Sequence, residues 1–187
     1  MVTCHYNSAF SGMSREEIRQ FCDLNEYQLI GSALFAKNES IVSKLVSWVC
    51  KGKAKDEKFI PSHVGSLILC GGHIYLFDMK PPKPTLTKFE DYLATTKDEY
   101  LLVMRNFGID TEKFSLGILS RVNQRYGYLS AIQSAFKFLW YPLREHCSEI
   151  HLKELQEQGL FTNENANETT PEDLKEILLA YKGDIPA

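Results

Sequence analysis

The sequence lacks the features that would place the protein across a membrane or on a nucleic acid. No stretch approaches the ~20 consecutive apolar residues of a membrane-spanning helix, and the opening residues MVTCHYNSAF contain no basic segment followed by an apolar run. We therefore expect a cytoplasmic protein with neither a transmembrane segment nor a signal peptide. An excess of positive charge is also missing, because the net charge is -3 and the lysines are scattered along the chain. Nucleic acid is therefore not an expected partner.

Cysteines are few and odd in number, which argues against a disulfide framework. The five are Cys4, Cys22, Cys50, Cys70 and Cys147. Their spacing is not that of a small secreted domain, so we expect the thiols to be reduced. Reduced thiols remain available as nucleophiles or as metal ligands.

Internal repeats and extended low-complexity segments are missing too. The chain has 187 residues, of which 44% are hydrophobic and 24% are charged. This is enough to bury one sizeable core and too little for two full domains. We expect a single domain over residues 1–187, in which residues 1–26 form an N-terminal helical extension.

Hydrophobic periodicity predicts strands in the middle of the chain and helices around them. A capping-box pattern at Ser14 and Glu17 indicates one helix start, and Thr170 before Pro171 indicates another. The segment HVGSLILCGGHIYLFDM has two apolar runs around a glycine pair, which predicts a β-hairpin. Helices are predicted at residues 14–23, 40–50, 111–124, 128–140, 147–158 and 171–181, and further strands at residues 27–36 and 100–105. The predicted fold class is α+β, a small antiparallel sheet packed with helices.

Two segments carry more local predictions. In the helix predicted at residues 40–50, one apolar face is expected to join the core, namely Ile41, Leu45, Trp48 and Val49. The prolines of KPPKPTL are expected to impose an extended linker after the hairpin.

A cysteine among polar residues points to a chemical role for the segment LREHCSEIHLKEL. Cys147 lies at the start of the predicted helix 147–158, where free backbone N–H groups and the helix dipole stabilise a thiolate. A nearby imidazolium would lower the pKa of the thiol further. Cys147 is therefore a candidate nucleophile, and its own backbone N–H could hold part of an oxyanion.

A base for this thiol is available in the predicted hairpin. His63 begins the first strand, in PSHVGSLIL, and Asp78 lies near the end of the second, in IYLFDM. Adjacent antiparallel strands could bring the two side chains together, so that the carboxylate orients the imidazole that activates the thiol.

These residues lie within a longer resemblance. In order along the chain, the segments GSALFAKNESIVSKLVSWV, SHVG, YLFDM, YGYLSAIQ, HCSEI and TTPEDL resemble the circularly permuted papain-like cysteine hydrolases of the NlpC/P60 superfamily, in particular the YiiX-like group. The resemblance implies Cys147 as nucleophile, His63 as base and Asp78 as orienter. The order of histidine before cysteine, the reverse of ordinary papain-like enzymes, is the order that permutation would produce.

The sequence departs from the family pattern at three positions. Ser32 stands where an aspartate commonly follows the glycine, Asp78 stands where glutamate is frequent, and His146 precedes the cysteine where an aromatic residue is usual. These departures concern the local geometry of the site and its substrate.

Other interpretations of the same residues remain open. Cys147 could be a small buried hydrophobe, His63 could cap or hydrogen-bond a strand end, and Asp78 could simply make a turn before the proline-rich segment. Cys70, His73, Cys147 and His151 could be written as a Cys2His2 zinc set, although their spacing is poor. The domain could also be a non-catalytic binding module that kept the fold and lost turnover.

The interpretation that the sequence favours is a thiol hydrolase of the amidase or peptidase type, acting through a cysteine acyl-enzyme without a metal or cofactor. An acyltransferase would use the same chemistry with an alcohol or amine in place of water. The substrate would contain an amide or ester, and the resembling superfamily includes enzymes that act on peptidoglycan peptides and acyl lipids.

Overall fold

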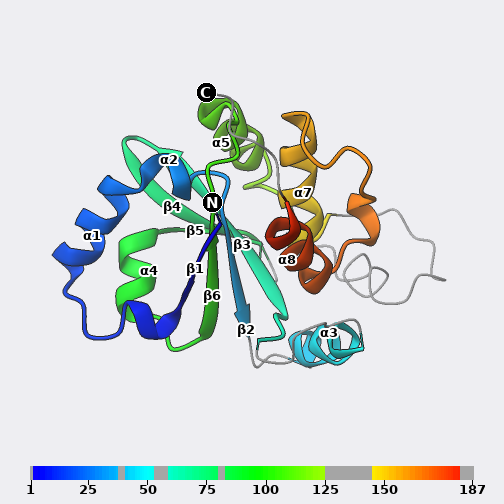
Figure 1. The fold of residues 1–187 in the computed structure, drawn as a ribbon, viewed down its shortest axis with the longest axis horizontal. Coiled ribbons are helices and arrows are strands. Elements are labelled where there is room, and N and C mark those ends of the chain that lie inside the picture. Colours follow the sequence, from blue (N-terminus) through cyan, green and yellow to red (C-terminus); the bar gives the residue numbers. More distant parts are fainter. Residues whose placement is uncertain (1, 38–40, 53–58, 80–82, 125–144, 182–187) are drawn as a thin grey trace.

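The computed structural model, drawn in Figure 1, describes residues 2–37, 41–52, 59–79, 83–124 and 145–181. Its centre is one six-stranded sheet with the order β1-β6-β2-β3-β4-β5, in which all neighbouring strands are antiparallel. The strands are β1 (Thr3–Tyr6), β2 (Ala33–Lys37), β3 (His63–Cys70), β4 (His73–Asp78), β5 (Thr85–Lys88) and β6 (Glu99–Met104). The predicted α+β class with an antiparallel sheet is confirmed.

Helices lie on both faces of this sheet. They are α1 (Arg15–Leu24), α2 (Glu26–Leu29), α3 (Ile41–Lys51), α4 (Phe89–Thr95), α5 (Thr111–Leu119), α7 (Cys147–Glu157) and α8 (Pro171–Ala180), with short 3-10 turns η1 (Asn7–Ala9) and η2 (Ala166–Glu168). Figure 1 shows α1 and α4 on one side of the sheet and α5, α7 and α8 on the other. Within the described ranges, no helix has both the length and the apolar composition that crossing a membrane requires.

The sheet separates two hydrophobic cores because successive residues of a strand point to opposite faces. In β6, Leu101 and Val103 join the core with α5, α7 and α8, whereas Tyr100, Leu102 and Met104 join the core with α1 and α4. A strand buried on both faces is apolar throughout rather than alternating, which explains the unbroken apolar run YLLVM.

The β3–β4 hairpin forms as the glycine pair predicts. Gly71 and Gly72 have φ angles of 56° and 74°, the left-handed backbone that a two-residue hairpin turn requires. The register pairs Cys70 with His73 beside the turn and Gly65 with Asp78 at the open end. The hairpin therefore places Asp78, together with the start of β3, at the end of the sheet away from the turn.

The helix starts indicated by local sequence patterns are also confirmed. Ser14 and Glu17 form a reciprocal capping box before α1, and Thr170 forms one with Asp173 before α8. Helix α7 begins at Cys147, as the sequence predicts. Each of these signals lies within four consecutive residues, so it acts wherever the chain packs afterwards.

Several elements differ from the prediction. The strand predicted at residues 27–36 begins only at Ala33, because Glu26–Leu29 form α2 and Gly31 turns the chain with a φ of 82°. Strand β5 follows the prolines where only a linker was expected, and α4 was not predicted. Strand β1 lies within the predicted helical extension and pairs with β6 at the sheet edge. Strand β1 gains its hydrogen bonds from β6, about 100 residues later, and β5 gains them from β4, the preceding strand. Neither strand's own sequence reveals this pairing.

The helical predictions need two further corrections. Trp48 was expected to join the core, but it is 67% exposed, and the described buried side chains of α3 are Val46 and Cys50. Helix α5 ends at Leu119, earlier than expected. The helix predicted at residues 128–140 lies outside the described residues.

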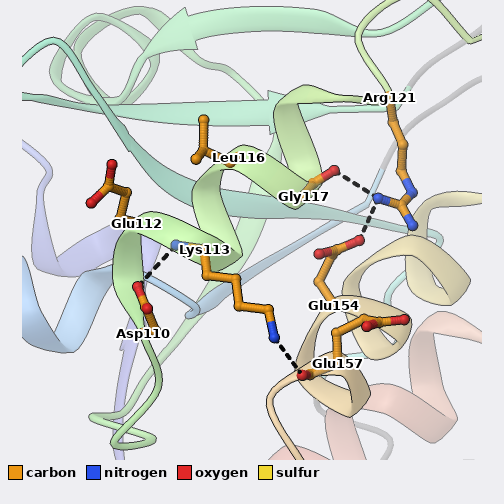
Figure 2. Close-up of a pocket in the computed structure, with 8 residues that line it drawn as sticks. All are labelled: Asp110, Glu112, Lys113, Leu116, Gly117, Arg121, Glu154 and Glu157. Atoms are coloured by element: carbon orange, nitrogen blue, oxygen red, sulfur yellow. Dashed lines mark hydrogen bonds and ion pairs between the residues drawn. The ribbon is translucent and has the colours of Figure 1, made fainter.

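Helices α5 and α7 approach each other closely at Gly117, which Figure 2 shows beside Glu154. A Cβ atom there would lie 1.7 Å from Glu154 Oε2, and the Glu154 carboxylate forms an ion pair with Arg121. Gly117→Ala would push this buried carboxylate off its partner, so we expect the free energy of unfolding to fall by about 1–3 kcal/mol.

Urea unfolding measures this change, with Leu116→Ala as the control because its side chain is exposed. At an unobstructed helix position, replacement of glycine by alanine stabilises a protein. A stabilised Gly117→Ala variant would therefore contradict the close contact.

Candidate active site

Strands β3 and β4 bring His63 and Asp78 together. Asp78 lies opposite Gly65, and His63 is two residues before Gly65 on the same face of β3, so the two side chains are diagonal neighbours. His63 Nε2 and Asp78 Oδ1 form a hydrogen bond, with only 8% and 7% of the respective side chains exposed. The absence of a side chain at Gly65 also leaves room for Leu76, whose Cδ1 would lie 2.5 Å from a Cβ atom there.

Helix α7 brings Cys147 to the same pair. Cys147 is the first residue of the helix and is 5% exposed. Its sulfur shares a hydrogen bond with the His63 side chain and accepts hydrogen bonds from the backbone amides of Val64 and Ser148. Because Asp78 occupies Nε2 of His63, the other ring nitrogen, Nδ1, is left for the sulfur. The three residues predicted from sequence therefore form one chain of contacts from α7 through β3 to β4.

The charges around Cys147 and His63 favour proton transfer from the Cys147 sulfur to the His63 imidazole. Burial alone would lower the pKa of His63, but the charges of Asp78 and Cys147 and the hydrogen bonds that the imidazolium donates to both raise that pKa to about 10. Burial alone would raise the pKa of Cys147, but the His63 charge and hydrogen bonds hold that pKa below its ordinary value. Both shifts favour the form in which a Cys147 thiolate lies beside a His63 imidazolium.

Two other buried cysteines show how burial changes the pKa of a thiol that has no imidazole beside it. Burial raises the pKa of Cys22 to about 12 and that of Cys50 to about 11. Cys147 is buried as well, yet its pKa moves in the opposite direction. The lowered pKa of Cys147 therefore comes from its position against His63 and the helix start.

Polar contacts between α7 and its neighbours were not foreseen from sequence. His151 lies one helical turn after Cys147 and its Nδ1 is 2.8 Å from Ser66 Oγ on β3. Burial lowers the pKa of His151 to about 4, so its imidazole is neutral. Ser148 Oγ donates to the carbonyl oxygen of Thr169 over 2.7 Å. Spacing could have found His151, which lies four residues after Cys147 on the same face of the helix. It could not have found Ser66, because a residue three positions after His63 points to the other face of the strand.

Ser32 connects backbone segments rather than reaching the site. Its backbone N–H donates to the carbonyl oxygen of Leu29 over 2.9 Å. Its Oγ accepts a hydrogen bond of 3.1 Å from the backbone N–H of Arg105 and donates to the carbonyl oxygen of Gln28. The hydroxyl at this position therefore joins the start of β2 to the segment that follows β6.

The residues of the zinc alternative do not converge. Cys70 and His73 face each other beside the hairpin turn, seven residues of β3 away from His63, which is about 23 Å of strand. His151 is hydrogen-bonded to Ser66 instead. Among the described residues, no group of three or more His, Cys, Asp or Glu side chains is arranged so that it could hold a metal ion.

A separate hollow of about 630 Å³ lies between α5 and α7 and is drawn in Figure 2. The residues described around it include no nucleophile, and both of its cationic side chains already have partners. Arg121 pairs with Glu145 and Glu154, and Lys113 Nζ donates to the Glu157 carbonyl oxygen over 3.2 Å. We therefore place the candidate chemistry at Cys147 and not in this hollow.

No known family model matches the chain, and no curated protein shows significant sequence similarity to it.

Proposed function

We propose that the protein is a thiol hydrolase of the permuted papain-like type, which cleaves an amide or ester through a cysteine acyl-enzyme. The observation that carries this proposal is the contact chain Cys147–His63–Asp78, in which the pKa of the thiol is lowered and that of the imidazole is raised. A buried cysteine with a purely structural role would have a raised pKa, as Cys22 does.

The arrangement supports the following reaction. The Cys147 thiolate attacks the substrate carbonyl carbon, a C–S bond forms, and the carbonyl electron pair moves onto oxygen. As the tetrahedral species collapses, the leaving amine or alcohol takes the proton from His63. The neutral His63 then removes a proton from water, which attacks the thioester and releases the acid and the Cys147 thiolate. Asp78 keeps the imidazole oriented through both steps.

The topology is consistent with the permuted arrangement. The histidine strand β3 and the acidic strand β4 precede the nucleophile helix α7 in the chain, and α7 packs against β3 from one face of the sheet. We propose a cytoplasmic enzyme of one domain, and peptidoglycan peptides and acyl lipids as the substrate classes to test first.

The proposal predicts selective alkylation of Cys147. At pH 6, an ordinary thiol with a pKa of ~8.5 is only about 0.3% ionised, whereas the lowered pKa of Cys147 gives this thiol a larger thiolate fraction. We expect iodoacetamide to modify Cys147 at least ~10-fold faster than the exposed Cys4. Peptide mapping after brief labelling measures both rates.

His63→Ala serves as the control, because it removes the imidazolium and should abolish the preference. Faster labelling of Cys4 in the unmodified protein would remove Cys147 from the site. Turnover itself is tested with p-nitrophenyl acetate, for which we expect a burst of p-nitrophenol and an acetyl thioester on Cys147. A panel of amide, ester and muropeptide substrates then identifies the preferred bond.

A further inference from the structure

His146 caps the helix that carries the nucleophile. Its Nδ1 accepts a hydrogen bond of 3.1 Å from the backbone N–H of Glu149, and the Glu149 carboxylate accepts one of 3.4 Å from the His146 backbone N–H. This reciprocal box closes the first turn of α7, directly beside Cys147. A histidine at this position is one of the departures from the pattern of the resembling family.

The capping contact determines the protonation of the ring. Since Nδ1 accepts a hydrogen bond, it carries no proton, and the proton of the neutral ring is on Nε2. Burial holds the pKa of His146 below its ordinary value, which keeps the ring neutral. The nearby Glu149 carboxylate is already bound by Lys153 Nζ at 2.7 Å. His146 therefore presents an Nε2–H donor at neutral pH.

Among the described residues this donor has no partner. The His146 side chain is buried, with the whole residue 1% exposed, and its Nε2 makes no hydrogen bond within the described part of the chain. The two nitrogens of an imidazole lie on different sides of the ring, so Nε2–H is directed away from the amide that Nδ1 caps. An unpaired buried donor is costly and rare in native structures. His146 directly precedes Cys147 in the chain, so this donor belongs to the residue next to the nucleophile.

We propose that His146 Nε2–H is the second oxyanion donor of the site, acting together with the backbone N–H of Cys147. This inference rests on the proposed thiol hydrolase function. When the thiolate attacks, the carbonyl electron pair moves onto oxygen, and the two N–H groups donate hydrogen bonds to that oxyanion without transferring a proton. When the C=O bond re-forms, the leaving group departs with the proton of His63, and Nε2–H keeps its own. His146 thus fills a catalytic role that was open in the sequence.

The test compares two reactions of the same sulfur in His146→Asn. Asparagine is a favoured N-cap residue, so its side-chain oxygen can still accept from the Glu149 amide, but it has no donor at the position of Nε2. Hydrolysis of p-nitrophenyl acetate develops an oxyanion, and we expect its kcat/KM to fall about 10²–10³-fold. Alkylation by iodoacetamide is a displacement at a saturated carbon and develops none, so its rate at Cys147 should stay within about threefold of the wild type.

Two further variants secure the interpretation. Ser14→Asn makes the same kind of exchange at the cap of the remote helix α1, and both rates should remain unchanged. His146→Ser retains a capping oxygen with a different side chain and should repeat the result of His146→Asn.

Each outcome decides the proposal. Equal losses of hydrolysis and alkylation would show a structural role for His146 and overturn it, as would hydrolysis within twofold of the wild type. A wild-type protein whose p-nitrophenyl acetate turnover does not depend on Cys147 would overturn the proposed function itself, and this inference with it. Failure of the oxyanion assignment alone would instead leave wild-type turnover and Cys147 acylation intact.

Discussion

Cys147→Ala is expected to abolish hydrolysis while leaving the fold intact. The sulfur forms the only covalent bond between enzyme and substrate in the proposed reaction, so we expect kcat to fall by a factor on the order of 10⁶, to the background rate. Alanine removes one atom from a small side chain at the start of α7, and the capping box of His146 and Glu149 is untouched. Turnover of p-nitrophenyl acetate and circular dichroism measure the two effects.

A second readout links this loss to the geometry of the site. The Cys147 charge is one of the causes that raise the pKa of His63 to about 10. In Cys147→Ala that pKa should therefore fall, although Asp78 still supports the imidazolium. An NMR titration of the His63 ring detects the change.

Cys22→Ala is the matched control for Cys147→Ala. Cys22 is also a buried thiol, 4% exposed, but it belongs to the core with α1 and α4. Its replacement should leave turnover unchanged and cost only packing energy. Persistent hydrolysis in Cys147→Ala, or equal losses in the two variants, would contradict the assignment of the nucleophile.

Asp78→Asn is expected to lower kcat by about 10²–10⁴-fold with little change in fold. The negative charge of Asp78 is the largest contribution that raises the pKa of His63. Without it the imidazole loses its proton more readily, and Cys147 loses the positive charge that stabilises its thiolate. Asp78→Glu keeps the charge and should retain more activity.

The pH dependence follows from the direction of these shifts. A His63 pKa of about 10 means that the proton needed by the leaving group is present below pH 10 and is lost above it. Wild-type hydrolysis should therefore persist to near pH 10 and decline beyond. In Asp78→Asn the alkaline decline should begin at lower pH, while alkylation of Cys147 should require higher pH because the pKa of the thiol rises.

Rates measured from pH 5 to pH 11 separate these two shifts, and Asp91→Asn is the control for loss of an aspartate charge. Asp91 pairs with Arg15 beside α1 and α4, so its replacement should leave both pH profiles unchanged. An Asp78→Asn variant with wild-type rates and profiles would show that Asp78 does not orient His63.

Local signals in the sequence determined several parts of this structure. The capping boxes at Ser14 and Thr170, the start of α7 at Cys147 and the turn at Gly71–Gly72 all formed where the sequence placed them. Each depends on backbone conformation and hydrogen bonds within a few residues, which are the same in any tertiary context. Because the hairpin is encoded locally, it also restricts His63 and Asp78 to neighbouring strands.

Tertiary packing alone decided how the site is assembled. The approach of Cys147 to His63 depends on α7 lying against β3, and this contact joins segments that are far apart in the chain. The edge strands β1 and β5 likewise exist only through their partners β6 and β4. Exposure of Trp48 was misjudged for the same reason, because helical periodicity defines an apolar face but not which side of α3 packs against α8. Cys147 was thus visible in the chain as a candidate nucleophile, whereas its lowered pKa arises from long-range contacts that no local pattern encodes.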